Sequence, residues 1–287
     1  MIARVLAAWV CLGVLSALAA PMHVYDDAGQ LHVFASPPRR IVSLTPHLTE
    51  LLFAVGAGDQ VVGVDAASDH PPAARRLPRV GDYSRLHLER ILALQPDLVV
   101  AWLGGNRAAD LHAVRQLGIP VLLTEAVRLD DVARLLALLG HTTGHAGTGT
   151  QAAKDYRARL AALKARYGRA NRVPVFYQVW DRPLMTLGGQ HWISEALAVC
   201  GARNVFGDLG GWGGVVSREA VLRREPAVIA GGADGPNLGR SWQAYRSLAA
   251  VRHEAYVQVD ADRLHRASPR LIEGVEALCR ALAPYGR

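Results

Sequence analysis

Residues 88–102 read LERILALQPDLVVAW, and residues 217–232 repeat the same pattern as SREAVLRREPAVIAGG. Each copy has a glutamate, Glu89 or Glu219, near the start of an expected helix, then a proline and an apolar run of strand type. An acidic residue in a first turn complements the helix dipole, and a proline marks the end of a helix. Each copy therefore predicts a short helix followed by a buried strand.

A second repeat precedes each copy of the first. TELLFAVGAGDQVV from Thr49 and SEALAVCGARNVF from Ser194 share the order helix, glycine turn and strand. Short β-branched runs alternate with helical sequence along the chain, which is the pattern of a mostly parallel sheet. We expect an α/β protein of two similar, Rossmann-like lobes with a ligand cleft between them, since pockets favour domain interfaces.

The segment TQAAKDYRARLAALKARYG is a strong helix by composition, and its apolar residues Tyr156, Leu160 and Leu163 follow helical spacing. We interpret it as one long helix between the lobes, a stiff link that permits only small changes in their angle. The expected parts are an N-terminal lobe, this connecting helix and a C-terminal lobe, at residues 20–146, 147–168 and 169–287.

The first 19 residues have the features of an export signal. MIAR carries positive charge, VLAAWVCLGVLSALA is apolar, and Ala17-Leu18-Ala19 is a small-x-small cleavage site. No later apolar run approaches the roughly 20 residues of a membrane span. We expect a soluble periplasmic protein whose signal peptide is cleaved near Ala19.

Two cysteines remain once Cys11 leaves with the signal peptide. Cys200 and Cys279 both fall in the second lobe, and an even count in an oxidising compartment favours a disulfide. The alternative is a pair of unpaired buried thiols.

No enzyme signature stands out in the sequence. It has no GxSxG elbow and no P-loop, and its GxGxxA match, at Gly147, follows a polar loop instead of a strand. His141 and His145 flank Gly144 and have no acidic or cysteine cluster nearby, which argues against a metal pair. The net charge is +7 with scattered basic residues, a poor match to nucleic-acid binding. We expect a protein that is not an enzyme and needs neither a metal nor a catalytic cofactor.

Six peptides link the mature chain to a known family: RIVSLTPHLTELLFAVG, SDHPPAA, LERILALQPDLVVAWLGGN, LAVCGARNVF, VSREAVL and HRASPRL. With these the chain resembles the periplasmic vitamin B12-binding proteins of cobalamin ABC importers, within the helical-backbone substrate-binding proteins. The resemblance covers both lobes. It implies a Cys200–Cys279 disulfide, cobalamin as the transported ligand, and an inner-membrane ABC permease with its cytoplasmic ATPase as the partner. We expect the receptor itself to be a monomer.

Cobalamin is a large, neutral, flat macrocycle rimmed with amides, so its site needs aromatic faces and a few hydrogen-bonding groups. Four aromatic residues lie in expected loops or strand ends: Tyr83, Trp102, Trp180 and Trp212. Each is alternatively a core residue. The resemblance favours a ligand role for Tyr83 and Trp102 and leaves both roles open for Trp180 and Trp212. Two further tryptophans read as packing residues on helices, Trp192 and Trp242.

Polar candidates come from two other loops. The resemblance implies that Asp262 and Arg266 lie near the corrin edge, where an Asp accepts from amides and an Arg donates to carbonyls. The alternative is an ordinary i, i+4 surface ion pair. His70 stands where the family commonly has tyrosine, and the open choices are coordination of cobalt, a hydrogen bond to the ligand rim, or polar surface.

Glu89 and Glu219 occupy equivalent places in the two lobes. The resemblance implies that they dock onto arginines of the permease, and a pair of matched charges suits a two-fold symmetric partner. The alternative is that both only complement a helix dipole.

A haem-binding protein of the same fold is the main rival interpretation. Tyr83 lies nearly where haem-binding relatives keep an axial tyrosine, and His70 would supplement it. The peptides SDHPPA, AWLGGN and RASPR together favour cobalamin. A siderophore or a bare metal ion is a weaker third choice, because no cluster of arginines or metal ligands is evident.

Overall fold

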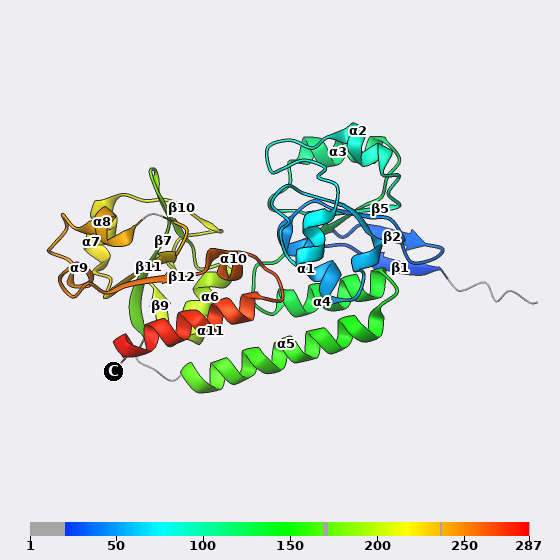
Figure 1. Cartoon of the computed structure of the whole chain (residues 1–287). Coiled ribbons are helices and arrows are strands. Elements are labelled where there is room, and N and C mark those ends of the chain that lie inside the picture. The colour runs from blue at the N-terminus through cyan, green and yellow to red at the C-terminus, as the bar shows by residue number, and fades with distance from the viewer. Residues whose placement is uncertain (1–20, 169–171, 236, 287) are drawn as a thin grey trace, which may run out of the picture.

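Two α/β lobes and a long helix that runs alongside both of them make up the computed structural model, which describes residues 21–168, 172–235 and 237–286 (Figure 1). The predicted signal peptide at residues 1–19 lies outside the described residues. Within those residues, no helix combines the length and the apolar character needed to cross a membrane.

The N-terminal lobe is built on a four-stranded parallel sheet in the order β4-β3-β5-β6. Its strands are β3 (Ile41–Ser43), β4 (Val61–Val64), β5 (Leu98–Trp102) and β6 (Val121–Thr124). An antiparallel hairpin precedes them, β1 (Met22–Tyr25) with β2 (Leu31–Phe34). The helices of this lobe are α1 (Pro46–Ala54), η1 (Gly58–Gln60), η2 (Pro72–Arg76), α2 (Leu88–Ala93), α3 (Ala108–Gln116) and α4 (Asp131–Thr142).

The C-terminal lobe is built on a mixed sheet. Its strands are β7 (Val173–Asp181), β8 (Leu184–Leu187), β9 (Ala202–Asn204), β10 (Gly213–Val215), β11 (Val228–Gly232) and β12 (Tyr256–Val259). Its helices are α6 (Trp192–Val199), α7 (Arg218–Arg224), α8 (Leu238–Trp242), α9 (Ala249–Arg252), α10 (Ala261–Leu264), α11 (Leu271–Leu282) and η3 (Ala283–Gly286).

The parallel parts of the two sheets have the same topology. β9, β7, β11 and β12 pair in parallel in that order, as β4, β3, β5 and β6 do in the first lobe. The repeated helix also ends in the same way in both lobes, since Gln95 and Glu225, each just before the proline, both have φ of 45°. The residue before a proline is kept out of the right-handed helical region, so the helix stops there. The two-lobed α/β fold predicted from the repeats is confirmed.

The long helix α5 (Ala146–Tyr167) supplies the connection predicted between the lobes. Tyr156, Leu160 and Leu163 are buried, as their spacing predicts. α5 packs closely on α4 where Gly140 and Gly149 meet. A Cβ atom added to Gly140 would lie 2.7 Å from the Cα of Gly149, so a larger residue would not fit there. One cluster of buried apolar side chains includes residues of both lobes and of α5. The helix is therefore part of a continuous core rather than an isolated tether.

The predicted disulfide is present. Cys200, at the end of α6, is bonded to Cys279 in α11 with an S–S distance of 2.05 Å. The two cysteines are 79 residues apart in sequence, and their bond joins two helices of the C-terminal lobe.

Candidate ligand-binding site

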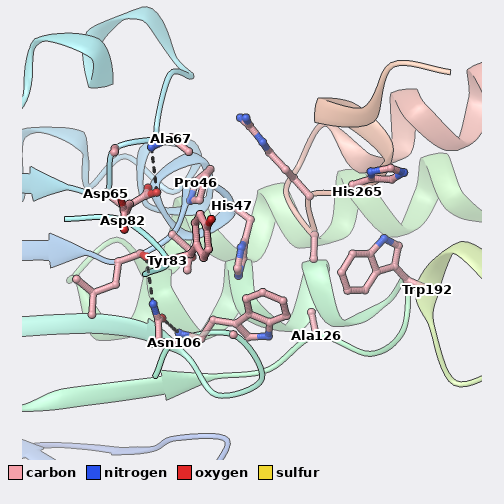
Figure 2. Close-up of a pocket in the computed structure, with 17 residues that line it drawn as sticks. Pro46, His47, Asp65, Ala67, Asp82, Tyr83, Asn106, Ala126, Trp192 and His265 are labelled. Carbon is pink, nitrogen blue, oxygen red and sulfur yellow. Dashed lines mark hydrogen bonds between the residues drawn. The ribbon is translucent and has the colours of Figure 1, made fainter. Parts of the chain in front are cut away.

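A cavity of about 500 Å³ lies between the lobes (Figure 2). Most of its wall comes from the segments that follow the carboxyl ends of β3, β4, β5 and β6, which is where α/β sheets commonly bind ligands. The opposite wall comes from the start of α6 and the loop after α10. The lining residues are 44–47, 65–67, 82–83, Trp102, 105–106, Ala126, Trp192 and 265–267.

Aromatic rings form a connected group at this cavity. Trp102 makes an edge-on contact with His47 at 5.5 Å between ring centroids and contacts Trp212 at 5.7 Å. Trp212 in turn contacts Trp192 at 5.5 Å. Trp212 is not among the lining residues, so it supports Trp102 and Trp192 from beside the cavity.

The loop after β5 holds Trp102 in place. The indole Nε1 donates to Glu125 Oε1 at 2.8 Å, and the backbone N–H donates to Asn106 Oδ1 at 2.8 Å. Gly105 lies directly against the indole, because a Cβ atom there would overlap the ring. Trp102 is therefore half-buried. Glu125 and Gly105 fix its ring, and another part of the ring lines the cavity.

An ionic cluster joins the two lobes beside the cavity. The Arg266 guanidinium contacts Asp69 at 2.7 Å, Asp262 at 2.6 Å and Glu50 at 3.4 Å. Arg270 forms a bidentate pair with Glu50, at 2.8 and 2.6 Å. Glu50 lies on α1 and its side chain is 2% exposed. Charge-assisted bidentate pairs of this kind are strong and directional.

The ion pair of Asp69 and Arg266 favours the charged form of both side chains. Burial by itself raises the pKa of the Asp69 carboxyl, but the hydrogen bond and the charge of Arg266 bring that pKa below its ordinary value. Burial opposes the charge of Arg266 as well, and Asp69, Asp262 and Glu50 together raise the pKa of its guanidinium. We infer that Arg266 reaches the cavity as a cation already held by three carboxylates.

Burial keeps two histidines of the cavity wall neutral, whereas hydrogen bonds from Ser84 and from backbone N–H groups lower the pKa of the Asp82 carboxyl, which also lines the cavity. Burial lowers the pKa of His47 to about 4 and also lowers the pKa of His265, whose Nε2 pairs with the Tyr177 hydroxyl at 2.8 Å. Burial raises the pKa of Asp65, although Ser68 and the backbone N–H of Ala67 hydrogen-bond to its carboxyl. Among the described residues, no group of three or more His, Cys, Asp or Glu side chains is arranged to hold a metal ion. The wall suits a large, mainly apolar ligand of low charge.

Three of the predicted site residues line the cavity: Tyr83, Trp102 and Arg266. Tyr83 is 87% exposed, so it stands at the mouth, while Trp102 and Arg266 lie deeper. These residues come from three separate segments of the chain, which the fold brings to one place.

The other predicted ligand residues lie outside the lining. Asp262 acts on the site through its ion pair with Arg266. Trp180 is 59% exposed near the end of β7, and its Nε1 donates to the Arg182 carbonyl at 3.1 Å. His70 lines a separate, smaller pocket with Pro269 and Arg270.

The two predicted docking residues are on different lobes. Glu89 is in the first turn of α2 and Glu219 is in the first turn of α7. Both side chains are exposed, and the two helices lie far apart in Figure 1.

Sequence reasoning missed several residues of the cavity. Trp192 was interpreted as a packing residue; it is 5% exposed and also lines the cavity. The second repeat could have indicated that Trp192 and His47 have equivalent positions. Aligning Thr49 with Ser194 places His47 opposite Trp192, and both residues lie at the start of equivalent helices. The Glu50–Arg270 pair carried no such signal, since its partners are 220 residues apart.

Comparisons with known proteins place the chain in one family. The family model described as "Periplasmic binding protein" matches residues 41–271. A vitamin B12-binding protein of Vibrio cholerae is 37% identical over 247 residues, covering 86% of this chain and 90% of the relative.

Solved structures agree with that placement. The periplasmic vitamin B12 binding protein BtuF of Vibrio cholerae is 37% identical, with a TM-score of 0.78, and the match covers 86% of this chain and 98% of that one. The periplasmic heme-binding protein RhuT from Roseiflexus sp. RS-1 is 25% identical, with a TM-score of 0.76, covering 87% and 99%. The family match and the extent of these similarities show that the chain belongs to the periplasmic binding protein family.

Proposed function

We propose that this protein captures cobalamin in the periplasm and delivers it to an inner-membrane ABC permease driven by a cytoplasmic ATPase. The observation that carries the proposal is the cavity between the lobes, with the fixed indole of Trp102 on its wall and little net charge around it. The similarity to proteins named for vitamin B12 binding over most of the chain supports the same ligand.

The chemistry of the wall matches that of the ligand. A corrin offers flat faces and a rim of neutral amides, and an aromatic ring packs well against such a face. Arg266 has donors for amide carbonyls, and Asp65 and Asn106 add polar groups to the wall. Binding by burial and hydrogen bonds needs no catalytic step, so the protein acts as a receptor and not as an enzyme.

Delivery requires a surface that the permease recognises. Glu89 and Glu219 are exposed, carry the same charge and lie at matching positions on two similar lobes. A permease with two-fold symmetry would present matching arginines to them. In this proposal a monomer whose signal peptide is cleaved near Ala19 carries the vitamin across the periplasm.

Haem is the second candidate ligand. Tyr83 supports it, because its exposed ring stands at the cavity mouth and a tyrosine is a known axial ligand of haem iron. Haem also brings two propionates, which need cationic partners. The only Arg or Lys side chain among the lining residues is Arg266, and three carboxylates already surround it. The site therefore suits a neutral ligand better.

Calorimetric titration of the mature protein with cyanocobalamin and, separately, with hemin distinguishes the two ligands. We expect tight one-to-one binding of cyanocobalamin, weak binding of hemin, and a large loss of cobalamin affinity in Trp102→Ala. Tight hemin binding with a tyrosinate-type iron spectrum that Tyr83→Ala abolishes would instead make the protein a haem receptor.

A further inference from the structure

His47 presents an imidazole to the cavity that has no hydrogen-bond partner in the described protein. The residue lines the cavity and is 8% exposed, so its ring is almost wholly enclosed. Figure 2 shows it beside Tyr83 on one wall, with Trp192 and His265 on the other. Because the ring lines the cavity and no group of the described residues pairs with its nitrogens, they are available to a ligand that enters there.

The position of this ring is well defined. His47 is the second residue of α1, and its ring meets the ring of Trp102 edge-on, at 5.5 Å and 89°. Trp102 is itself held by Glu125. A group that is fixed in this way loses little freedom when it binds a ligand.

The ring is also kept in the form that binds metals. Only an unprotonated imidazole nitrogen has a lone pair to donate. Burial lowers the pKa of His47 to about 4, and the charge of Arg266 acts in the same direction against the opposing effect of Glu50. The positive end of the α1 dipole further disfavours a proton on this ring.

The other histidines near the site differ from His47. His265 also lines the cavity, but one of its two ring nitrogens, Nε2, is paired with the hydroxyl of Tyr177. His70 lines a different pocket, next to Pro269. Sequence reasoning considered His70 for coordination of cobalt, whereas the structure brings His47 into the cavity.

We propose that His47 coordinates the cobalt of bound cobalamin through a ring nitrogen, in place of an exchangeable axial water. This inference rests on the proposed function and makes it more specific. In the exchange the bond between cobalt and the water oxygen breaks, and the imidazole lone pair forms the new bond. Cobalt keeps its oxidation state, and the neutral ring releases no proton. The site would thereby distinguish cobalamins by the group on this axial face.

Aquocobalamin and cyanocobalamin form the matched pair of ligands for a test. They share the corrin, but water exchanges readily while cyanide is held firmly. We expect wild-type protein to shift the absorption spectrum of aquocobalamin below neutral pH and to bind it about tenfold or more tightly than cyanocobalamin. In His47→Ala the shift and the preference should both disappear. Circular dichroism and urea unfolding of the variant, compared with the wild type, report that it is folded.

Three results would overturn the inference: tight binding of aquocobalamin to the wild type with an unchanged spectrum, a shift that persists in His47→Ala, or a shift that His70→Ala abolishes. Failure of the wild type to bind either cobalamin is a different result. It would reject the proposed function itself, so the two failures are distinguishable.

Discussion

Trp102 depends on its neighbours for its position on the cavity wall. Glu125 and Asn106 hold it by hydrogen bonds, and Gly105 leaves room for its ring. The position of a binding residue depends on the residues that support it, so changes at these supporting positions should affect the affinity for the ligand.

Gly105→Ala should weaken cobalamin binding by about tenfold or more, because the new methyl group would displace the indole of Trp102 from its place on the wall. Calorimetric titration measures the effect. Gly147→Ala is the control, since a Cβ atom at that position on α5 meets no atom within 4 Å. Equal affinities of the two variants would show that the position of Trp102 does not matter for binding.

The helices α1 and α6 begin at equivalent points of the two repeats and direct His47 and Trp192 towards the same cavity. α6 is capped by His191, whose Nδ1 accepts from the backbone N–H of Ile193 at 3.1 Å. Only an unprotonated nitrogen accepts, so the cap and the neutral state of this ring depend on each other.

Protonation of His191 should destabilise the fold at low pH. Burial, and then the charge of His265, lower the pKa of His191 to about 3, whereas an unfolded histidine titrates near 6.5. As the pH falls between these values the unfolded chain takes up a proton and the folded chain does not, which removes on the order of 4 kcal/mol of stability.

His191→Asn isolates this contribution, because asparagine caps a helix and does not titrate. Unfolding free energies measured in urea from neutral to acidic pH should fall more steeply for the wild type than for the variant. Parallel curves for the two proteins would contradict the assignment of this pH dependence to His191.

Sequence patterns predicted the elements better than the contacts between them. The repeat around Glu89 and Glu219 predicted two equivalent helix–strand units, because helix ends and buried strands depend on local sequence. The Glu50–Arg270 pair was not predicted, since it depends on how the two lobes meet in space. His47 was not predicted either, because its contact with Trp102 depends on how α1 and β5 lie in the fold. The resemblance to a family pointed to Trp102, Tyr83 and Arg266, which all line the cavity.

Three features join the lobes of the whole molecule: the helix α5, the shared apolar core, and the ionic cluster around Arg266. We expect them to limit the movement of the lobes relative to one another, so that the cavity exists before the ligand arrives. Glu50 is the most buried charge of the cluster and contacts both Arg266 and Arg270.

Glu50→Gln should lower the free energy of unfolding by about 3 kcal/mol, because it leaves the half-buried Arg270 and Arg266 without their shared buried carboxylate. Glu273→Gln is the matched control. Its carboxylate is 41% exposed and lies 3.6 Å from Arg263, so its loss should cost less than about 1 kcal/mol. Urea denaturation of both variants tests this, and equal losses would show that the cluster is no more important than a surface ion pair.

The proposed docking onto the permease would also be a property of the whole molecule, since it would use both lobes at once. Reversing both charges, Glu89→Arg with Glu219→Arg, should abolish vitamin uptake in cells while calorimetry shows unchanged cobalamin binding. Asp155→Arg changes an exposed charge on α5 and should leave uptake intact. If the double variant also loses binding, the defect lies in folding; if uptake continues, the two glutamates do not form the docking surface.

The most direct test of cobalamin capture between the lobes is a crystal structure of the mature protein with cyanocobalamin. We expect the corrin to occupy the cavity lined by Trp102, Tyr83 and Arg266, with the indole of Trp102 against the macrocycle. A corrin bound elsewhere on the protein, or a cavity that stays empty at saturating vitamin, would contradict this assignment.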